Sequence, residues 1–169
     1  IWGITVTAAR KDEEEVALQA VEFWSTVAEI EGDILDDGGD CHKFVQNAVK
    51  HLCGLLLELL TKQDEHAEEG ETNISNAAGT CLALVSRVAG DSVVTEVMPF
   101  VSQFINSNNW KDKEAATFAF CAILDGPSSD AMTKLVTQAI PVMTQHVVET
   151  SGPIGTQTAQ SEGQKLLKD

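Results

Sequence analysis

Residues 74–105, which read ISNAAGTCLALVSRVAGDSVVTEVMPFVSQFI, decide the fold. In both halves of this stretch apolar side chains recur three and four positions apart, as on one face of an α-helix. The two apolar stripes consist of Ala77, Cys81, Leu84, Val85 and Val88, and of Val94, Val97, Met98, Val101 and Ile105. Ala89-Gly90 ends the first half, and Asp91-Ser92 offers a cap for the second. The stretch predicts two helices, 73–88 and 93–105, joined by a tight turn.

The same register occurs twice more in the chain. The positions i, i+4, i+7 and i+8 are apolar at Val16, Ala20, Phe23 and Trp24, and again at Ala115, Ala119, Ala122 and Ile123. A helix breaker lies at a comparable depth in the helix that follows each stripe: Gly54, Pro99 and Pro141. This repetition predicts further helices at about 12–28, 43–60, 111–124 and 130–148. The apolar stripe of the helix 43–60 consists of Val45, Val49, Leu52, Leu56, Leu59 and Leu60.

Stacked pairs of helices with a common stripe form an α-solenoid, in which each pair buries its apolar face against its neighbours. We predict an all-α fold of about three two-helix repeats, 12–60, 73–105 and 110–148, with a period suited to HEAT repeats of about 40 residues. The first interval is lengthened by two acidic loops, 29–42 and 61–72. Residues 1–10 read as the end of an earlier, partial repeat, so that 1–148 forms one segment. Residues 149–169 are polar and predict a flexible tail or a degenerate next helix.

The charge of the chain excludes several classes of function. The 169 residues have a net charge of −15 and a sequence pI near 4.5, which disfavours binding to nucleic acid or to anionic lipid and favours basic polypeptides. No apolar run approaches the about 20 residues of a membrane span. The cysteines match no zinc or redox spacing, and three of them lie within apolar helical segments, so we expect buried, reduced thiols in a cytosolic or nuclear protein.

Signatures of catalysis are missing from the sequence. The four histidines are scattered, and no phosphate-binding loop, nucleophile elbow or zinc-protease motif occurs. We therefore predict a binding protein that is not an enzyme and needs no cofactor or metal. Trp24 is expected to pack in the core. Trp110, at a helix start, is expected to pack between repeats, with a partly exposed anchor as the alternative.

The most acidic stretch follows the second predicted helix. It contains five carboxylates, Asp64, Glu65, Glu68, Glu69 and Glu71, and no Lys or Arg occurs from Gln63 to Ser86. Burying unpaired carboxylates is costly, so the stretch is expected to be a solvated loop. Two interpretations stay open on the residues alone. One is a solubilising connection between helices, and the other is a docking loop for a basic partner.

Several segments, in order along the chain, resemble the importin-β family of nuclear import receptors, in its plant or protist form. They are 15–25 (EVALQAVEFWS), 60–65 (LTKQDE), 73–82 (NISNAAGTCL), 97–100 (VMPF), 110–120 (WKDKEAATFAF) and 123–127 (ILDGP). The resemblance covers about residues 4–148. It implies a stretch of a HEAT-repeat solenoid.

The resemblance also implies a function and three kinds of partner. These are importin-α, through its basic importin-β-binding segment, or a basic cargo signal; Ran in its GTP form; and Phe-Gly nucleoporins. Such a receptor shuttles between cytoplasm and nucleus. The family's acidic loop falls on Asp64–Thr72, which assigns the docking role to the five carboxylates named above. The alternative function is a generic HEAT-repeat scaffold without Ran coupling.

Two departures from the family pattern affect the expected contacts. Thr72 stands where the family loop ends in a Trp, which removes a cation–π contact of about 1–2 kcal/mol. Residues 155–160, GTQTAQ, replace a family segment that carries a second Trp. The resemblance therefore implies docking through charge more than through aromatic anchors.

Overall fold

The computed structural model describes residues 1–11, 13–63 and 73–137. Contacts divide the chain into two units, Ile1–Ser128 and Ser129–Asp169, and each is considered by itself. Within the described ranges every regular element is a helix, as predicted. The helices of the first unit are α1 (Trp2–Lys11), α2 (Glu14–Asp36), α3 (Phe44–Leu60), α4 (Ile74–Ala89), α5 (Asp91–Phe104) and α6 (Trp110–Ala122). No helix in these ranges has the length and apolarity needed to cross a bilayer.

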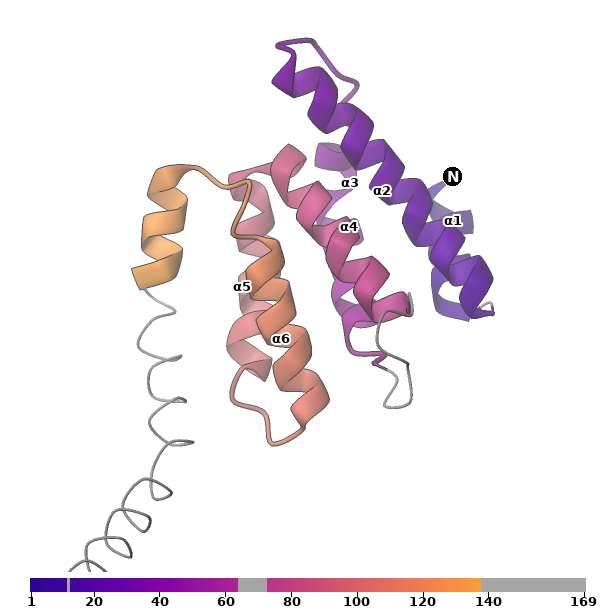
Figure 1. Ribbon diagram of the computed structural model, residues 1–169, viewed down its shortest axis with the longest axis vertical. Helices are drawn as coiled ribbons and strands as arrows, with labels where there is room; N and C mark the ends of the chain where they lie inside the picture. The colour runs from indigo at the N-terminus through magenta and orange to yellow at the C-terminus, as the bar shows by residue number, and fades with distance from the viewer. Residues whose placement is uncertain (12, 64–72, 138–169) are drawn as a thin grey trace, which may run out of the picture. The chain divides into compact units, whose positions relative to one another are not determined.

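The helices of the first unit form two layers (Figure 1). Helices α2, α4 and α6 lie side by side in the layer nearer the viewer, and α1, α3 and α5 lie behind them. Consecutive helices alternate between the layers, which is the arrangement of an α-solenoid built from stacked helix pairs. The predicted fold class, a HEAT-type solenoid, is thereby confirmed.

Helices adjacent in sequence do not all pack equally. The extensive contacts are α1 with α2, α3 with α4 and α5 with α6, whereas α2 touches α3 and α4 touches α5 only sparsely. The repeat boundaries 12–60, 73–105 and 110–148 stay a prediction. The packing favours a division that begins one helix earlier, into the pairs α1–α2, α3–α4 and α5–α6. In this division the acidic stretch 61–72 connects the two helices of one pair.

The core lies between the layers and is richest around α3. Leu52, Leu56, Leu59 and Leu60 of α3 are fully buried, as their stripe predicts. Leu55 and Leu57 are buried as well, because α3 packs against α4, α5 and α6. The stripes of α4 and α6 also face the core, through Cys81, Val85 and Val88 and through Ala115, Ala119 and Ala122.

Helix α2 differs from the prediction in its buried face. The stripe through Val16 and Phe23 was expected to be buried, yet these side chains are 46% and 39% exposed. The buried side of α2 instead runs through Ala17, Ala20, Val21, Trp24 and Ala28. Small side chains on this side let α2 approach α4 and α1 closely, which the bulkier stripe would prevent. Trp24 itself is buried, as expected.

The last third of α2 was predicted to be a loop, and this was wrong. Residues 29–36 continue the helix, although their polar composition suggests otherwise. Glu31 is buried because its carboxylate accepts hydrogen bonds from the backbone of Phe44 and Val45, at 2.7 and 3.0 Å, and so caps α3 from another helix. Gly32 lies against Val88 of α4. Tertiary contacts therefore extend the helix that local sequence would end.

The end of the first unit is held by a contact that the sequence did not indicate. Asp91 was expected to cap α5, but the cap residue is Gly90 and no side chain caps this helix. The Asp91 carboxylate instead accepts hydrogen bonds from the backbone N–H and hydroxyl of Ser128, at 2.6 and 2.9 Å. Pro99 lies inside α5 as predicted.

In the second unit, residues 129–137 are helical, in agreement with the start of the predicted helix 130–148. The remainder of that helix, Pro141 and the predicted tail 149–169 lie outside the described residues.

Candidate protein-binding surface

The five carboxylates of the predicted docking loop, Asp64, Glu65, Glu68, Glu69 and Glu71, lie outside the described residues. The structure does describe the residues on both sides of them, Gln63 and Asn73. We call these two positions the roots of the acidic segment 64–72. Their contacts show which helices the segment starts from and returns to.

The two helices that flank the segment are joined directly at its base. The hydroxyl of Ser75, in the first turn of α4, donates a buried hydrogen bond of 3.0 Å to the carbonyl of Leu60, the last residue of α3. The Asn73 side chain accepts from the backbone N–H of Asn76 at 2.9 Å and caps α4. The end of α3 and the start of α4 therefore lie close together.

The first root is bound to α6. The Gln63 side-chain amide donates to the carbonyl of Lys111 at 3.1 Å, and the Lys111 ammonium donates back to the carbonyl of Gln63 at 3.2 Å. The ammonium also lies 5.5 Å from the ring centroid of Trp110. Trp110 is 50% exposed, so the expected packing between repeats is wrong and the partly exposed alternative is the one observed.

The residue that follows the second root contacts α2. The backbone N–H of Ile74 donates to the Glu14 carboxylate at 3.3 Å, and Glu14 is the first residue of α2. The acidic segment is thus tied at one end to the start of α6 and at the other to the start of α2. Both helices belong to the same layer as α4 (Figure 1).

Helix α2 is itself strongly acidic along its length. Between Glu14 and Asp36 it carries seven acidic residues and no Lys or Arg, and all but Glu31 are exposed. Glu15, Glu22 and Glu29 are seven residues apart and therefore share one line along the helix. Such a line of exposed carboxylates attracts a basic polypeptide.

A line of exposed apolar side chains runs beside these carboxylates. Val16, Phe23 and Ile30 each follow one of the three glutamates, and they are 46%, 39% and 54% exposed. We call the six residues together the α2 face. Sequence reasoning missed this surface by assigning Val16 and Phe23 to the core. The signal that was available is the Glu-apolar doublet, repeated every seven residues.

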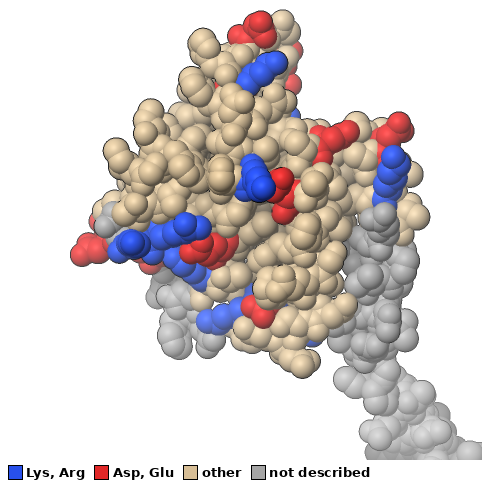
Figure 2. Space-filling model, turned by 180° about the vertical axis from the view of Figure 1, so that it is seen from behind, with Lys and Arg blue, Asp and Glu red and all other residues tan. Residues whose placement is uncertain are grey.

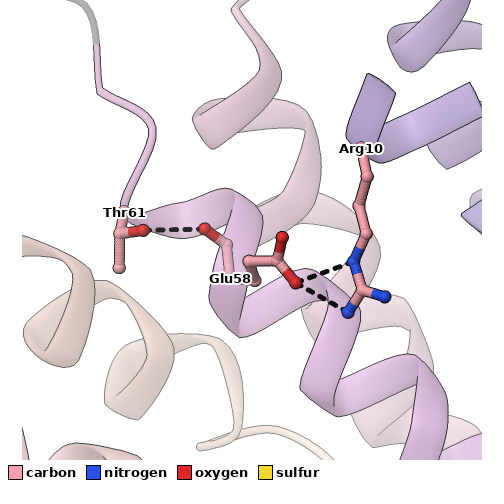
Figure 3. Close-up of polar contacts among 3 residues, drawn as sticks. All are labelled: Arg10, Glu58 and Thr61. Atoms are coloured by element: carbon pink, nitrogen blue, oxygen red, sulfur yellow. Dashed lines mark hydrogen bonds and ion pairs between the residues drawn. The ribbon is translucent and has the colours of Figure 1, made fainter. Parts of the chain in front are cut away.

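The opposite side of the molecule has a different charge pattern (Figure 2). Lys and Arg alternate there with Asp and Glu in small groups on a mostly uncharged surface. An oppositely charged pair also joins α1 to α3, where the Nε and Nη2 atoms of Arg10 contact one carboxylate oxygen of Glu58 at 2.8 and 2.6 Å (Figure 3). The hydroxyl of Thr61 donates to the backbone carbonyl of Glu58 at 2.8 Å. Close oppositely charged neighbours leave less net field for steering a partner than α2 provides.

An aromatic cluster fastens α1 to the other helices. The Trp24 indole N–H donates to the hydroxyl of Thr5 at 3.0 Å, and its ring packs edge-on against Trp2 at 5.6 Å. Trp2 also lies 5.8 Å from the His51 ring of α3. These contacts explain why Trp24 is buried, and they hold α1 against both layers.

The four cysteines differ in burial. Cys53 and Cys81 are buried free thiols, and burial raises the pKa of each from 9.0 to about 12. The expectation of burial is wrong for Cys121, which is exposed, and Cys41 is half-buried. Within residues 1–11, 13–63 and 73–137, no three His, Cys, Asp or Glu side chains converge as a metal site would require.

Comparison with known proteins identifies relatives over most of the chain. No family model matches it. It is 46% identical over 154 residues to importin subunit beta-1 of Arabidopsis thaliana, and 39% identical over 175 aligned positions to that of Schizosaccharomyces pombe. These alignments cover 85% and 97% of this chain. The chain spans only about a fifth of the relatives, 18% and 20% of their lengths.

Solved structures agree with these relatives. Importin beta crystallised in ammonium sulfate superposes with a TM-score of 0.83 and 34% identity, over 90% of this chain and 18% of that one. Kap95p in complex with RanGDP and Kap95 in complex with Nup1 each give a TM-score of 0.80 and 32% identity. They cover 91% and 93% of this chain, and 18% and 19% of theirs. Sequence and fold agree over the same residues, and the chain therefore belongs to the importin-β family of HEAT-repeat proteins.

Proposed function

We propose that this chain is part of a nuclear import receptor that acts by reversible binding and not by catalysis. Its partners are importin-α, through a basic segment, or a basic cargo; Ran-GTP; and Phe-Gly nucleoporins. The receptor carries protein cargo through the nuclear pore and so occurs in cytoplasm and nucleus. Nucleic acid and membranes are not among the proposed partners.

The observation that carries the proposal is the α2 face. Glu14, which precedes this face, accepts a hydrogen bond from Ile74, two residues after the end of the acidic segment. Its carboxylates supply long-range attraction to Lys and Arg, and its exposed Val16, Phe23 and Ile30 offer apolar contact to an amphipathic segment. The complexes that Kap95 forms with RanGDP and with Nup1 support the other two partners by relationship. The five carboxylates at 64–71 are proposed to contribute to binding of the basic partner as well.

The basic-partner part is tested by measuring how the chain binds a labelled peptide of the basic importin-α segment. We expect affinity to fall as salt rises from low to physiological levels, because exposed charge contacts are screened. Replacing Glu15, Glu22 and Glu29 together by Gln should weaken binding about 3- to 150-fold, since each of the three exposed pairs is worth about 0.2–1 kcal/mol.

A matched control changes the net charge by the same amount elsewhere. Glu96→Gln, Glu114→Gln and Asp125→Asn also remove three negative charges but lie outside α2. This variant should bind the peptide within about twofold of the original chain, as distant exposed charges are screened. If the two triple variants lose the same affinity, only the net charge of the chain matters, and the α2 face is not a specific binding surface. Binding that does not depend on salt would contradict the proposal.

Ran coupling separates a transport receptor from a scaffold. The test inserts this segment in place of the corresponding one in full-length yeast importin subunit beta-1. A receptor should bind Ran carrying a non-hydrolysable GTP analogue more tightly than Ran-GDP. A chimera that folds but does not discriminate between the two would favour the scaffold.

A further inference from the structure

The first helix pair, α1 and α2, is joined to the second pair, α3 and α4, mainly through one layer. Helices α2 and α4 pack extensively side by side in the layer nearer the viewer of Figure 1, whereas α1 and α3 behind them do not. The next joint is built differently, because α5 contacts α3 in one layer and α6 contacts α4 in the other. The two joints therefore differ in how freely they can bend.

The contact between α2 and α4 is fixed at both ends. Where the two helices begin, the Glu14 carboxylate accepts a hydrogen bond from the backbone N–H of Ile74 at 3.3 Å. Near their ends, the Arg87 guanidinium donates to the Asp36 carboxylate at 2.8 Å. Between these contacts the buried side of α2 consists mainly of small side chains. Two helices held in this way keep one easy relative motion, which is a rotation about the line along which they touch.

Two side-chain contacts bridge α1 and α3 across the same joint. Arg10, in the last turn of α1, pairs with Glu58, in the last turn of α3, at 2.6 Å (Figure 3). The Trp2 ring lies 5.8 Å from the His51 ring. The side chains of the ion pair are 42% and 43% exposed. An ion pair that is open to solvent is weak and is screened by salt, so it can open without unfolding the helices.

A rotation about the α2–α4 line would act mainly on α1 and α3. Because neighbouring helix axes lie about 8–10 Å apart, a rotation of about 10–20° would separate α1 from α3 by about 1.5–3 Å. That displacement breaks the Arg10–Glu58 contact. The hydrogen bonds of Glu31 to the start of α3 begin on α2 itself, close to the line, and move less. Helix α1 follows α2, because Trp24 is hydrogen-bonded to Thr5.

We propose that the joint between the first and second helix pairs is a hinge and that the Arg10–Glu58 pair is its salt-sensitive latch. When the latch is closed, α1 is held close to α3. When it opens, the first pair rotates about the α2–α4 line, the gap between α1 and α3 widens and the solenoid bends at this place. The α2–α4 contact is kept in both states. This hinge is a property of the fold and does not rest on the proposed function.

The test measures distances across three helix contacts with pairs of spin labels and electron paramagnetic resonance. Cys41 and Cys121 are first replaced by Ser so that they take no label, whereas Cys53 and Cys81 are buried and stay. The label pairs, all at exposed positions, are Thr7→Cys/Gly54→Cys across α1 and α3, Gln19→Cys/Thr80→Cys across α2 and α4, and Gly54→Cys/Gln103→Cys across α3 and α5.

The latch is broken by Arg10→Gln. The matched control is Arg87→Gln, which removes the same charge from an ion pair whose arginine side chain is equally exposed, at 42%, but which lies on the hinge line. The reversed pair Arg10→Glu/Glu58→Arg rebuilds the latch with opposite polarity. Each variant is measured at about 0.01 M and about 1 M salt, between which the Debye length falls from about 30 Å to about 3 Å. Circular dichroism and thermal unfolding show that each variant is folded.

In Arg10→Gln we expect the α1–α3 label distance to lengthen by about 2–3 Å, or to spread over a range wider by that amount. High salt should have the same effect on the original chain and no further effect on Arg10→Gln. The reversed pair should return the α1–α3 distance to its original value at low salt. The α2–α4 and α3–α5 distances should not change, and Arg87→Gln should leave the α1–α3 distance as it is.

Any of four results would overturn the inference. The first is an α1–α3 distance that is the same in the original chain and in Arg10→Gln at both salt concentrations. The second is an equal change in all three label pairs, which would mean a general loosening. The third is an Arg87→Gln variant that lengthens the α1–α3 distance as much as Arg10→Gln does, and the fourth is a reversed pair that stays open. No partner is present in these measurements, so the proposed function stands or fails independently of them.

Discussion

Gly79 of α4 lies against the Phe118 ring of α6, and this contact predicts the effect of adding a single methyl group. A Cβ at position 79 would stand 2.3 Å from Phe118 Cζ and 2.6 and 2.7 Å from the two Cε atoms. Separations below 3.0 Å force a neighbour to move. Overpacking of this kind costs about 1–3 kcal/mol. The half-buried ring can partly swing away, which places the cost in the lower part of that range.

The same substitution has a favourable part. Replacing Gly by Ala within a helix stabilises it by about 0.5–1 kcal/mol, since Ala has less backbone freedom to lose. The expected net effect of Gly79→Ala is therefore a destabilisation of about 1 kcal/mol. Gly54 of α3 is the matched control, because a Cβ there meets nothing within 4 Å. Gly54→Ala should stabilise the chain by about 0.5–1 kcal/mol.

Urea unfolding followed by far-UV circular dichroism measures both variants. A double-mutant cycle with Phe118→Ala then isolates the clash, because Gly79→Ala should become neutral or stabilising once the ring is gone. Two results would refute the reasoning. One is a Gly79→Ala variant as stable as Gly54→Ala, and the other is an unchanged penalty in the Phe118→Ala background.

Four further predictions concern the core and the surface. Glu31→Ala leaves one buried and one part-buried backbone N–H group of α3 without an acceptor and should cost about 2 kcal/mol, with faster amide exchange at the start of α3 and a smaller cost for Glu31→Gln. The raised pKa values of Cys53 and Cys81, about 12, keep both thiols neutral at pH 8, so a thiol reagent should modify only the other two cysteines in the native chain. Because the unfolded thiols ionise near pH 9, their contribution to stability is complete below that pH and is lost as pH rises toward 12, which thermal unfolding at increasing pH would show. The Arg10–Glu58 pair is half exposed, so Glu58→Gln should change the unfolding free energy by less than about 1 kcal/mol, and a larger change would contradict a surface role.

Much of the fold could be predicted because apolar spacing reports the buried face of a helix directly. The stripes of α3, α4 and α6 point into the core, and their helices begin and end within a few residues of the predicted limits. Helix propensity and period act within one turn or two, so they can be read without knowledge of neighbours. The HEAT-type solenoid followed from the repetition of one stripe.

The errors occur where a distant residue overrides the local pattern. Residues 29–36 look like a loop, but Glu31 is stabilised by the backbone of α3 and Gly32 by close approach to Val88. Asp91 lies where a helix cap is expected, yet its carboxylate accepts hydrogen bonds from Ser128, 37 residues further on. In each case the partner is separated by many residues, so no local window could contain both.

The sequence by itself determined an all-α repeating chain, an acidic character suited to basic partners, and a resemblance specific enough to be confirmed by relatives. Only the tertiary structure decided which side of α2 is buried, and hence that the six residues of the α2 face are exposed. It also decided that Gln63 meets Lys111 at the root of the acidic segment. The physical reason is that a helical period defines the faces of a helix, while the choice of the face that is covered depends on the shape of neighbours brought together by folding.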